Sequence, residues 1–187
     1  MSHLSQQHKD DSRIHKHNFW LDRLYLRLYR RGHHLYLSLR ENRSLINRIK
    51  MKLLRSVYNI LSHSYGCFVP FSAKIGSRVE FRHSFHGIFI SQLAEIGDDV
   101  VIMHHVTIGS NTDKDNNVGA PVIGNNVFIG AGACLIGNIR IGDYAKIGAN
   151  ATVVNDIPES ATVVGPKAKI LTRKEELPEY VENTETD

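Results

Sequence analysis

A six-residue period runs through nearly half of the chain and constrains its fold more than any other feature. From Ile75 to Val153, aliphatic or aromatic residues recur at every sixth position in three blocks, and Gly often follows them. Neither the period of an α-helix nor the alternation of a β-strand gives this spacing. The twelve residues on the period are Ile75 and Phe81, then Ile90, Ile96, Ile102 and Ile108, then Ile123, Ile129, Leu135, Ile141, Ile147 and Val153.

Such a period is expected of a chain that turns a corner after every hexad. Each hexad would supply a short strand with its aliphatic residue inward, and a corner where Gly, Asn or Asp accepts the turn. Three hexads would complete a coil, and coils would stack at about 4.8 Å, the spacing of paired strands. We therefore predict a mainly β fold, a parallel β-helix of about five coils over residues 67–171, with Pro158 to Leu171 closing its end.

Two interruptions of the period are candidate functional segments. Extra residues lie around His83–Gly87 and within the polar segment 110–121. Segments that break a rigid scaffold often carry function, because their sequence is free of the scaffold's packing constraints.

The residues before the repeat read as a polar arm (1–17) and a helical segment (18–66), and residues 172–187 read as a tail. Within the helical segment, a first helix from Phe19 is expected to stop near Gly32, and Asn42 or Ser44 could cap a second helix. The second helix is predicted by apolar residues at three- and four-residue steps, which place them on one helix face. They are Leu45, Ile46, Ile49, Leu53, Val57, Ile60 and Leu61.

The charge of the chain is concentrated in this helical segment. Ten basic residues and two acidic ones lie between Asn18 and Arg55. This pattern suits an element that docks or oligomerises, and it also suits peripheral contact with a membrane. Nucleic acid is not expected as a partner, because no aromatic reading platform accompanies the charge.

Composition indicates a cytoplasmic protein, including the inner face of the membrane as a location. The N-terminus has no apolar secretion signal, and no apolar run approaches a membrane span. Cys67 and Cys134 match no metal-ligand spacing and no disulfide framework.

Several short stretches of the repeat region carry a family resemblance: Ala73–Gly76, His83, Gly87–Ile90, Val106–Gly109, Ile129–Ala133 and Val164–Ile170. Through them, residues 67–170 resemble the hexapeptide-repeat acyltransferases, particularly the serine acetyltransferase branch and its relatives in capsule and exopolysaccharide gene sets. The resemblance implies a left-handed parallel β-helix, acetyl-CoA as cosubstrate, and a homotrimer with active sites between adjacent subunits. The helical segment could join two trimers.

Acetyl transfer to a hydroxyl needs a general base, and histidine is the usual one near neutral pH. His83 occupies the place of the catalytic base in the resembling family. His83 and His104 each lie two residues after an inward position, Phe81 and Ile102, so the period alone predicts that they stack on one edge. His86 and His105 are interpreted as surface or hydrogen-bonded histidines.

The resemblance also suggests where the coenzyme binds. Small residues at a corner would let the pantetheine arm approach the backbone, and lysines could meet the nucleotide phosphates. The candidate cofactor-binding residues are Ala131, Gly132, Lys146, Ala149, Lys167 and Lys169, with Ser110 and Asn111 beside the thioester.

Three departures from the serine acetyltransferase pattern favour a different acceptor. Phe68 stands where the family has an Asp that orients the base, Arg82 stands where an Asp often precedes the base, and residues 110–121 lack the family's Arg-His-Pro stretch. We expect a sugar of a surface or capsular polysaccharide as acceptor. The alternative is L-serine, in cysteine biosynthesis. Glu80 could replace the missing orienting carboxylate.

Two other classes remain as alternatives. A metal hydratase on this scaffold would need three histidines around one ion. His104 and His105 should point to opposite sides of a strand, so no metal is expected. A non-catalytic scaffolding solenoid is disfavoured by His83 and the Gly-Ala-Gly turn at residues 130–132.

Overall fold

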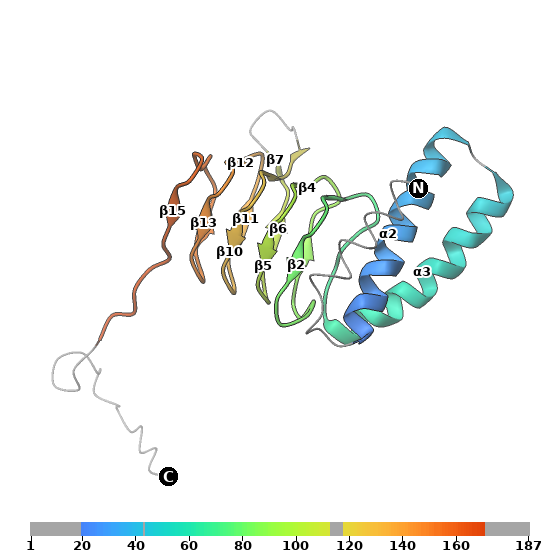
Figure 1. Ribbon diagram of the computed structural model, residues 1–187, viewed down its shortest axis with the longest axis horizontal. Coiled ribbons are helices and arrows are strands. Elements are labelled where there is room, and N and C mark those ends of the chain that lie inside the picture. Colours follow the sequence, from blue (N-terminus) through green and yellow to red (C-terminus); the bar gives the residue numbers. More distant parts are fainter. Residues whose placement is uncertain (1–19, 43, 113–117, 171–187) are drawn as a thin grey trace, which may run out of the picture.

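The computed structural model describes residues 20–42, 44–112 and 118–170. A hairpin of two helices is followed by a parallel β-helix whose coils stack away from it (Figure 1). The predicted arm (1–17) and tail (172–187) lie outside the described residues. Within the described part of the chain, no helix has the length and apolarity that crossing a membrane requires.

Three parallel sheets form the walls of the β-helix. The first wall contains β1 (Lys74–Ile75), β4 (Glu95–Ile96), β9 (Val122–Ile123) and β12 (Arg140–Ile141). The second wall contains β2 (Glu80–Phe81), β5 (Val101–Ile102), β10 (Phe128–Ile129), β13 (Lys146–Ile147) and β15 (Thr162–Val163). The third wall contains β3 (Phe89–Ile90), β6 (Thr107–Gly109), β11 (Cys134–Ile136) and β14 (Thr152–Val153).

The inward aliphatic residues stack in register from coil to coil. Phe81 pairs with Ile102, and Ile102 with Ile129, as neighbours in the second wall. All twelve residues on the six-residue period are buried, and none is more than 6% exposed. The predicted inward ladder is therefore confirmed, and it forms the core of the β-helix.

The number of coils also follows the prediction. The second wall has five strands, and isolated bridges add a fifth rung to each of the other two walls. Phe68 pairs with Phe89 at the helical end, and Ile157 pairs with Ile141 at the far end.

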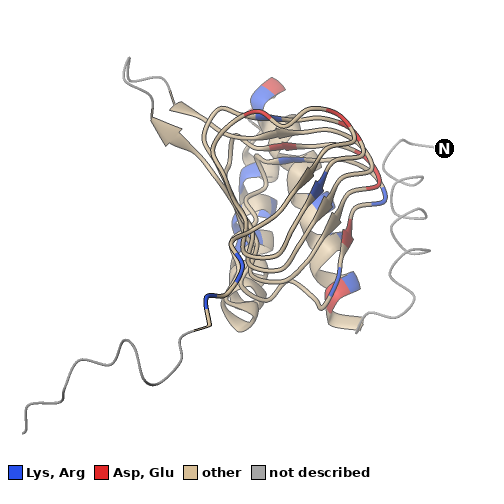
Figure 2. Cartoon of the chain, turned by 90° about the vertical axis from the view of Figure 1, so that its left-hand side faces the viewer, with Lys and Arg blue, Asp and Glu red and all other residues tan. Residues whose placement is uncertain are grey.

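One corner between the third and first walls carries an antiparallel excursion. It consists of β7 (Asn111–Thr112) and β8 (Val118–Gly119), which project from the stacked coils in the view of Figure 2. We call this edge the hairpin corner. The interruption at 110–121 is thus a hairpin that leaves the regular coil.

Helix α2 (Trp20–Glu41) continues through Gly32, so the predicted stop near that residue is wrong. Gly32 is buried, and a Cβ added there would lie 2.4 Å from the ring of Phe71. The glycine therefore lets the helix approach the first coil closely, and it does not end the helix.

Helix α3 (Leu45–Tyr65) packs through a different face from the one its hydrophobic pattern suggests. Ser44 makes no side-chain capping bond, and Gly66 ends the helix in a left-handed conformation. Met51, Tyr58 and Ser62 are buried. The apolar face points outward, and its exposed members are Leu45, Ile46, Ile49, Leu53, Val57 and Ile60.

The helices close one end of the β-helix by binding its backbone carbonyls. The Tyr29 hydroxyl donates to the Ala73 carbonyl oxygen at 2.6 Å, and the Tyr58 hydroxyl to that of Val69 at 2.7 Å. The guanidinium of Arg30, 2% exposed, donates to the carbonyls of Ile75 and Gly76. Buried carbonyls need such partners, so the hairpin caps the first coil.

Burial raises the pKa of Tyr25, Tyr29 and Tyr58 well above the ordinary value for a tyrosine. A raised folded pKa means that only the unfolded chain ionises just above pH 10. Stability should therefore be intact below pH 10 and fall above it, by about 1.4 kcal/mol per pH unit for each such tyrosine.

We expect Tyr58→Phe to cost about 1 kcal/mol at pH 8, because it deletes one buried hydrogen bond. Between pH 10 and 11.5 the variant should lose stability less steeply than the native chain. Urea unfolding followed by circular dichroism across this range measures both effects. Parallel pH profiles for the two proteins would contradict the assignment.

Candidate active site

One edge of the β-helix, between the second and third walls, collects the histidines, and we call it the histidine corner. Each coil contributes the residues that follow its second-wall strand. They are 83–87 in the first coil, 103–105 in the second, 130–132 in the third and 148–150 in the fourth. The corner is held together by bonds from His105 N to His86 O (2.9 Å), from Gly132 N to His104 O (3.1 Å) and from Asn150 N to Ala131 O (2.9 Å).

His83 and His104 lie next to each other on this corner. Their ring centroids are 5.5 Å apart and the rings are nearly perpendicular. The prediction that the two histidines lie on one edge, in successive coils, is therefore confirmed. His104 Nδ1 is buried and has no hydrogen-bond partner among the described residues. A buried nitrogen without a partner is costly, so a polar group that enters the corner would gain by binding it.

The turn that carries His83 has an unusual backbone. His83 and Ser84 both adopt left-handed φ angles, 62° and 69°, which L residues rarely do. The Ser84 hydroxyl donates to Oδ1 of Asp22 at 2.5 Å, and the Tyr65 hydroxyl donates to the same oxygen at 2.8 Å. Asp22 is 3% exposed. Both helices therefore hold the strained turn in place.

Burial and the hydrogen bond to Asp22 raise the pKa of Tyr65 to about 12, so its hydroxyl remains a donor at neutral pH. Sequence reasoning missed Asp22, Tyr65 and Ser84. The available signal was that Asp22 is a rare acid within a strongly basic segment. Its contact with Ser84 spans 62 residues, and no local pattern reports such a distance.

His86 and His105 pack against neighbouring groups at this corner. The His86 ring lies edge-on to Tyr65, with centroids 5.2 Å apart. The His105 ring lies 5.3 Å from that of His104. The expectation that His104 and His105 point to opposite sides of a strand is wrong, because His105 occupies a left-handed corner with φ 57°, where strand alternation does not apply.

Of the candidate coenzyme residues, Ala131, Gly132 and Ala149 lie on the histidine corner. Gly132 adopts φ 70°, which favours glycine, and a Cβ added there would lie 2.3 Å from Oδ1 of Asn150, so that side chain would have to move. Lys146 is exposed on β13, and Lys167 and Lys169 are exposed on the extended segment that follows β15.

Ser110 and Asn111 lie elsewhere, at the hairpin corner. Asn111 begins β7, and its Cβ lies 3.5 Å from the position of a Cβ added to Gly137, in the next coil. One chain therefore does not bring these two residues together with His83.

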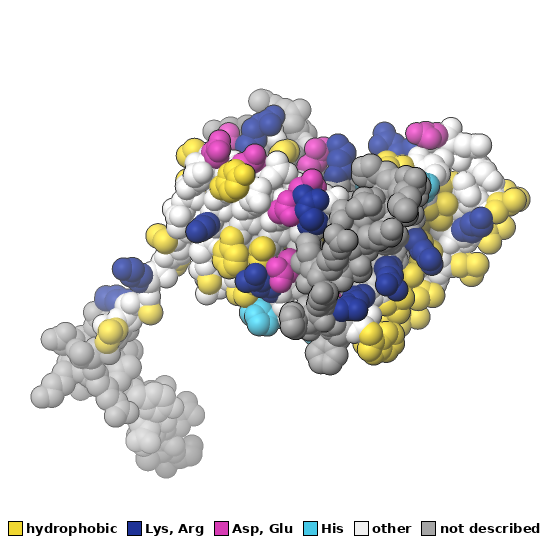
Figure 3. All heavy atoms as spheres, viewed as in Figure 1, with side chains coloured by type: hydrophobic (Ala, Val, Ile, Leu, Met, Phe, Trp, Pro, Cys, Tyr) yellow, Lys and Arg dark blue, Asp and Glu magenta, His cyan; other side chains and the backbone are white. Residues whose placement is uncertain are grey.

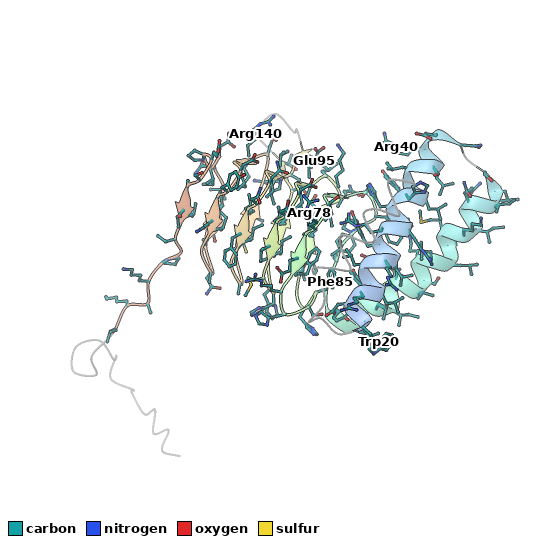
Figure 4. All side chains as sticks on the ribbon, viewed as in Figure 1. Trp20, Arg40, Arg78, Phe85, Glu95 and Arg140 are labelled. Atoms are coloured by element: carbon teal, nitrogen blue, oxygen red, sulfur yellow. The ribbon has the colours of Figure 1, made fainter. Side chains whose placement is uncertain are left out.

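Glu80 does not orient His83. Its carboxylate binds the guanidinium of Arg82, with an Nε–Oε1 distance of 3.1 Å. Figure 4 shows the side chains of the β-helix coil by coil, with Arg78 and Glu95 labelled on its first coils.

Phe68 lines a pocket of about 790 Å³ between α3 and the first coil. None of the histidines at positions 83, 86, 104 and 105 lines this pocket. In the described ranges, no three His, Cys, Asp or Glu residues are grouped so that they could hold a metal ion.

The sequence and the fold have counterparts among known proteins. The family model described as bacterial transferase hexapeptide (six repeats) matches residues 120–155. The chain is 39% identical over 142 residues to serine acetyltransferase of Helicobacter pylori, covering 76% of this chain and 82% of the relative. It is 38% identical over 146 residues to that of Haemophilus influenzae, covering 78% of this chain but only 54% of the relative.

Solved structures agree with these relatives. A serine acetyltransferase of Neisseria gonorrhoeae in complex with serine superposes with a TM-score of 0.70 and 30% identity, over 89% of this chain and 68% of the other. A serine acetyltransferase in complex with CoA gives a TM-score of 0.68 and 29% identity, over 90% and 69%. The expected left-handed β-helix with an N-terminal helical segment is thereby confirmed.

Gly87 offers a test of the packing at the histidine corner. It adopts φ 65°, and a Cβ added there would lie 2.1 Å from Nδ1 of His105. Gly66 has φ 57° with nothing within 4 Å of an added Cβ, so it is a matched control. Gly66→Ala should cost about 1 kcal/mol of stability and Gly87→Ala about 2–3 kcal/mol.

Combining Gly87→Ala with His105→Ala should recover the difference between the two glycine variants, because it removes the obstructing ring. Thermal and urea unfolding measure each step. Equal losses at Gly66 and Gly87 would show that His105 does not pack as described.

Proposed function

Because the chain belongs to the serine acetyltransferase branch of the hexapeptide-repeat transferases, we propose that it transfers the acetyl group of acetyl-CoA to the hydroxyl of L-serine. The observation that carries the proposal is the pair His83–His104 at one corner, in line with the small residues Ala131 and Gly132. A corner with little side-chain bulk leaves room for a long, narrow ligand along the coils.

His83 acts as the general base in this proposal. Its ring takes the proton of the acceptor hydroxyl as the oxygen attacks the thioester carbonyl. The tetrahedral intermediate collapses with loss of the CoA sulfur, which receives the proton back from the imidazolium. In the same proposal His104, whose ring centroid is 5.5 Å from that of His83, binds the oxyanion or the acceptor.

The choice of acceptor reverses the ranking reached from the sequence alone. The sequence departures at Phe68, Arg82 and residues 110–121 favoured a polysaccharide sugar over serine. The relatives described above, which match about three quarters of this chain, are serine acetyltransferases, and two matching solved structures are complexes with serine. These support L-serine as acceptor. The polysaccharide sugar becomes the second candidate, carried by those departures.

The proposed active unit is a homotrimer. The candidate site residues lie on two different edges of one chain, with Ser110 and Asn111 at the hairpin corner and His83 at the histidine corner. Association about a three-fold axis would bring the hairpin corner of one copy to the histidine corner of the next. This completes the site with residues of both.

Replacing His83 tests the catalytic assignment. We expect His83→Ala to lower kcat/KM about 10²- to 10⁴-fold, the usual contribution of a general base. The exposed His34 on α2 serves as control, and His34→Ala should leave turnover unchanged. Release of CoA thiol from acetyl-CoA in the presence of L-serine is the measurement. Full activity in His83→Ala would overturn the assignment.

An acceptor panel tests the substrate. L-serine, L-threonine, glycerol and acidic oligosaccharides are incubated with acetyl-CoA, and products are identified by the mass of one added acetyl group. Serine should be the preferred acceptor. Turnover of oligosaccharide but not of serine would restore the polysaccharide sugar as the preferred acceptor. Hydrolysis of acetyl-CoA without transfer to any of these acceptors would contradict both candidates.

Asp22 is proposed as a positioning residue, acting through Ser84 on His83. Asp22→Asn keeps the shape but removes the charge that accepts two hydrogen bonds. We expect kcat to fall about tenfold with KM for acetyl-CoA unchanged, since only the orientation of the base is disturbed. Ser56→Ala, on the exposed side of α3, is the control. A stability loss without a fall in kcat would limit Asp22 to a structural role.

A further inference from the structure

The outward face of α3 is an apolar ridge that no other part of the described ranges, 20–42, 44–112 and 118–170, covers. Its residues are exposed by one half to two thirds: Leu45 69%, Ile46 65%, Ile49 51%, Leu53 66%, Val57 51% and Ile60 68%. They recur at three- and four-residue steps and so form a continuous stripe along the helix. The face opposite the stripe packs on α2 and the first coil through Met51 and Tyr58.

Cationic side chains border this ridge. Arg48 and Lys52 lie along one side of the stripe and Lys50 along the other, as the 100° step per residue requires. All three are exposed, as is Arg55. Figure 3 shows hydrophobic side chains along the outer edge of the helical hairpin with Lys and Arg side chains beside them.

No carboxylate balances these cations within α3. The helix contains no Asp or Glu from its first residue to its last. No ion pair joins Arg48, Lys50, Lys52 or Arg55 to an acid in the described part of the chain. The ridge therefore presents apolar surface and uncompensated positive charge together.

We propose that the α3 ridge docks on an anionic phospholipid bilayer, with α3 lying in the plane of the interface. An amphipathic helix binds there by immersing its apolar face among the acyl chains, while flanking Lys and Arg reach the lipid phosphates. Both requirements are met by the stripe and its borders. The β-helix would remain on the aqueous side, because α3 packs on it through the face opposite the ridge.

Charge favours this occupant over a second copy of the chain. A closed two-fold interface places the same patch on both partners, so two ridges would bring eight uncompensated cations together. An anionic surface attracts the same cations instead. This proposal does not depend on the acceptor or on the catalytic roles assigned above.

Vesicle flotation with the full chain tests the proposal. Vesicles of phosphatidylcholine alone are compared with vesicles containing roughly one third phosphatidylglycerol, at low salt and at high salt. The protein should float with the anionic vesicles, remain unbound with the neutral ones, and dissociate at high salt.

Two variants separate the apolar and the charged contributions. Leu53→Ser with Ile60→Ser should weaken binding at least tenfold, since it removes two immersed side chains. Lys50→Gln with Lys52→Gln should weaken it about 25-fold, because each cation near an anionic surface contributes a factor of about five. All four residues are exposed, so the fold should tolerate both changes.

The matched controls are Val154→Ser and Arg140→Gln, an exposed apolar and an exposed basic residue on the β-helix. Both should float like the native chain, and all variants should keep their acetyl-transfer activity without vesicles. Absence of flotation, flotation unchanged in both ridge variants, or equal binding to neutral vesicles would overturn the proposal. So would a smaller oligomer by light scattering in Leu53→Ser/Ile60→Ser without any loss of vesicle binding, which would assign the ridge to contacts between copies.

Discussion

The in-register stacking of inward aliphatic residues is the constraint on which the rest of this structure depends. Each coil places its hydrophobic residue directly over that of the coil before, as Ile96 over Ile75 and Ile147 over Ile129. Because backbone hydrogen bonds between successive coils of each wall fix the same register, a residue's position along the period also fixes which edge it occupies. Catalytic and binding residues can then be aligned along one edge without being adjacent in the sequence.

The helical hairpin has two separate tasks in this arrangement. Its inner side satisfies the carbonyls of the first coil through Tyr29, Arg30 and Tyr58, so the solenoid does not end in an open edge. The buried carboxylate of Asp22 also reaches the turn of His83, which connects the cap to the proposed site. The outer side of α3 takes no part in either task, and this leaves its apolar ridge available for an external surface.

Much of the fold, and the part of the site formed by His83 and His104, follow from the sequence because they depend on spacing along the chain. A period of six is expected of a three-sided coil in which every sixth residue is buried, so the coils, the walls and the His83–His104 pair could be predicted from spacing alone. The acceptor is a different matter: the sequence departures favour a polysaccharide sugar, whereas the relatives support the proposal of L-serine. Family residues that the resemblance leaves without a counterpart, such as the orienting Asp near the place of Phe68, indicate which contacts are missing but do not identify the substrate.

The sequence by itself determined the β-helix, its five coils, the two interruptions and the edge shared by His83 and His104, because all of these depend on spacing along the chain. Only the tertiary structure decided that α2 runs through Gly32, that α3 turns its apolar face outward, and that Asp22 holds the turn of Ser84. These depend on which surfaces meet across long sequence separations. There, close packing and the need to satisfy buried polar groups outweigh local hydrophobic pattern.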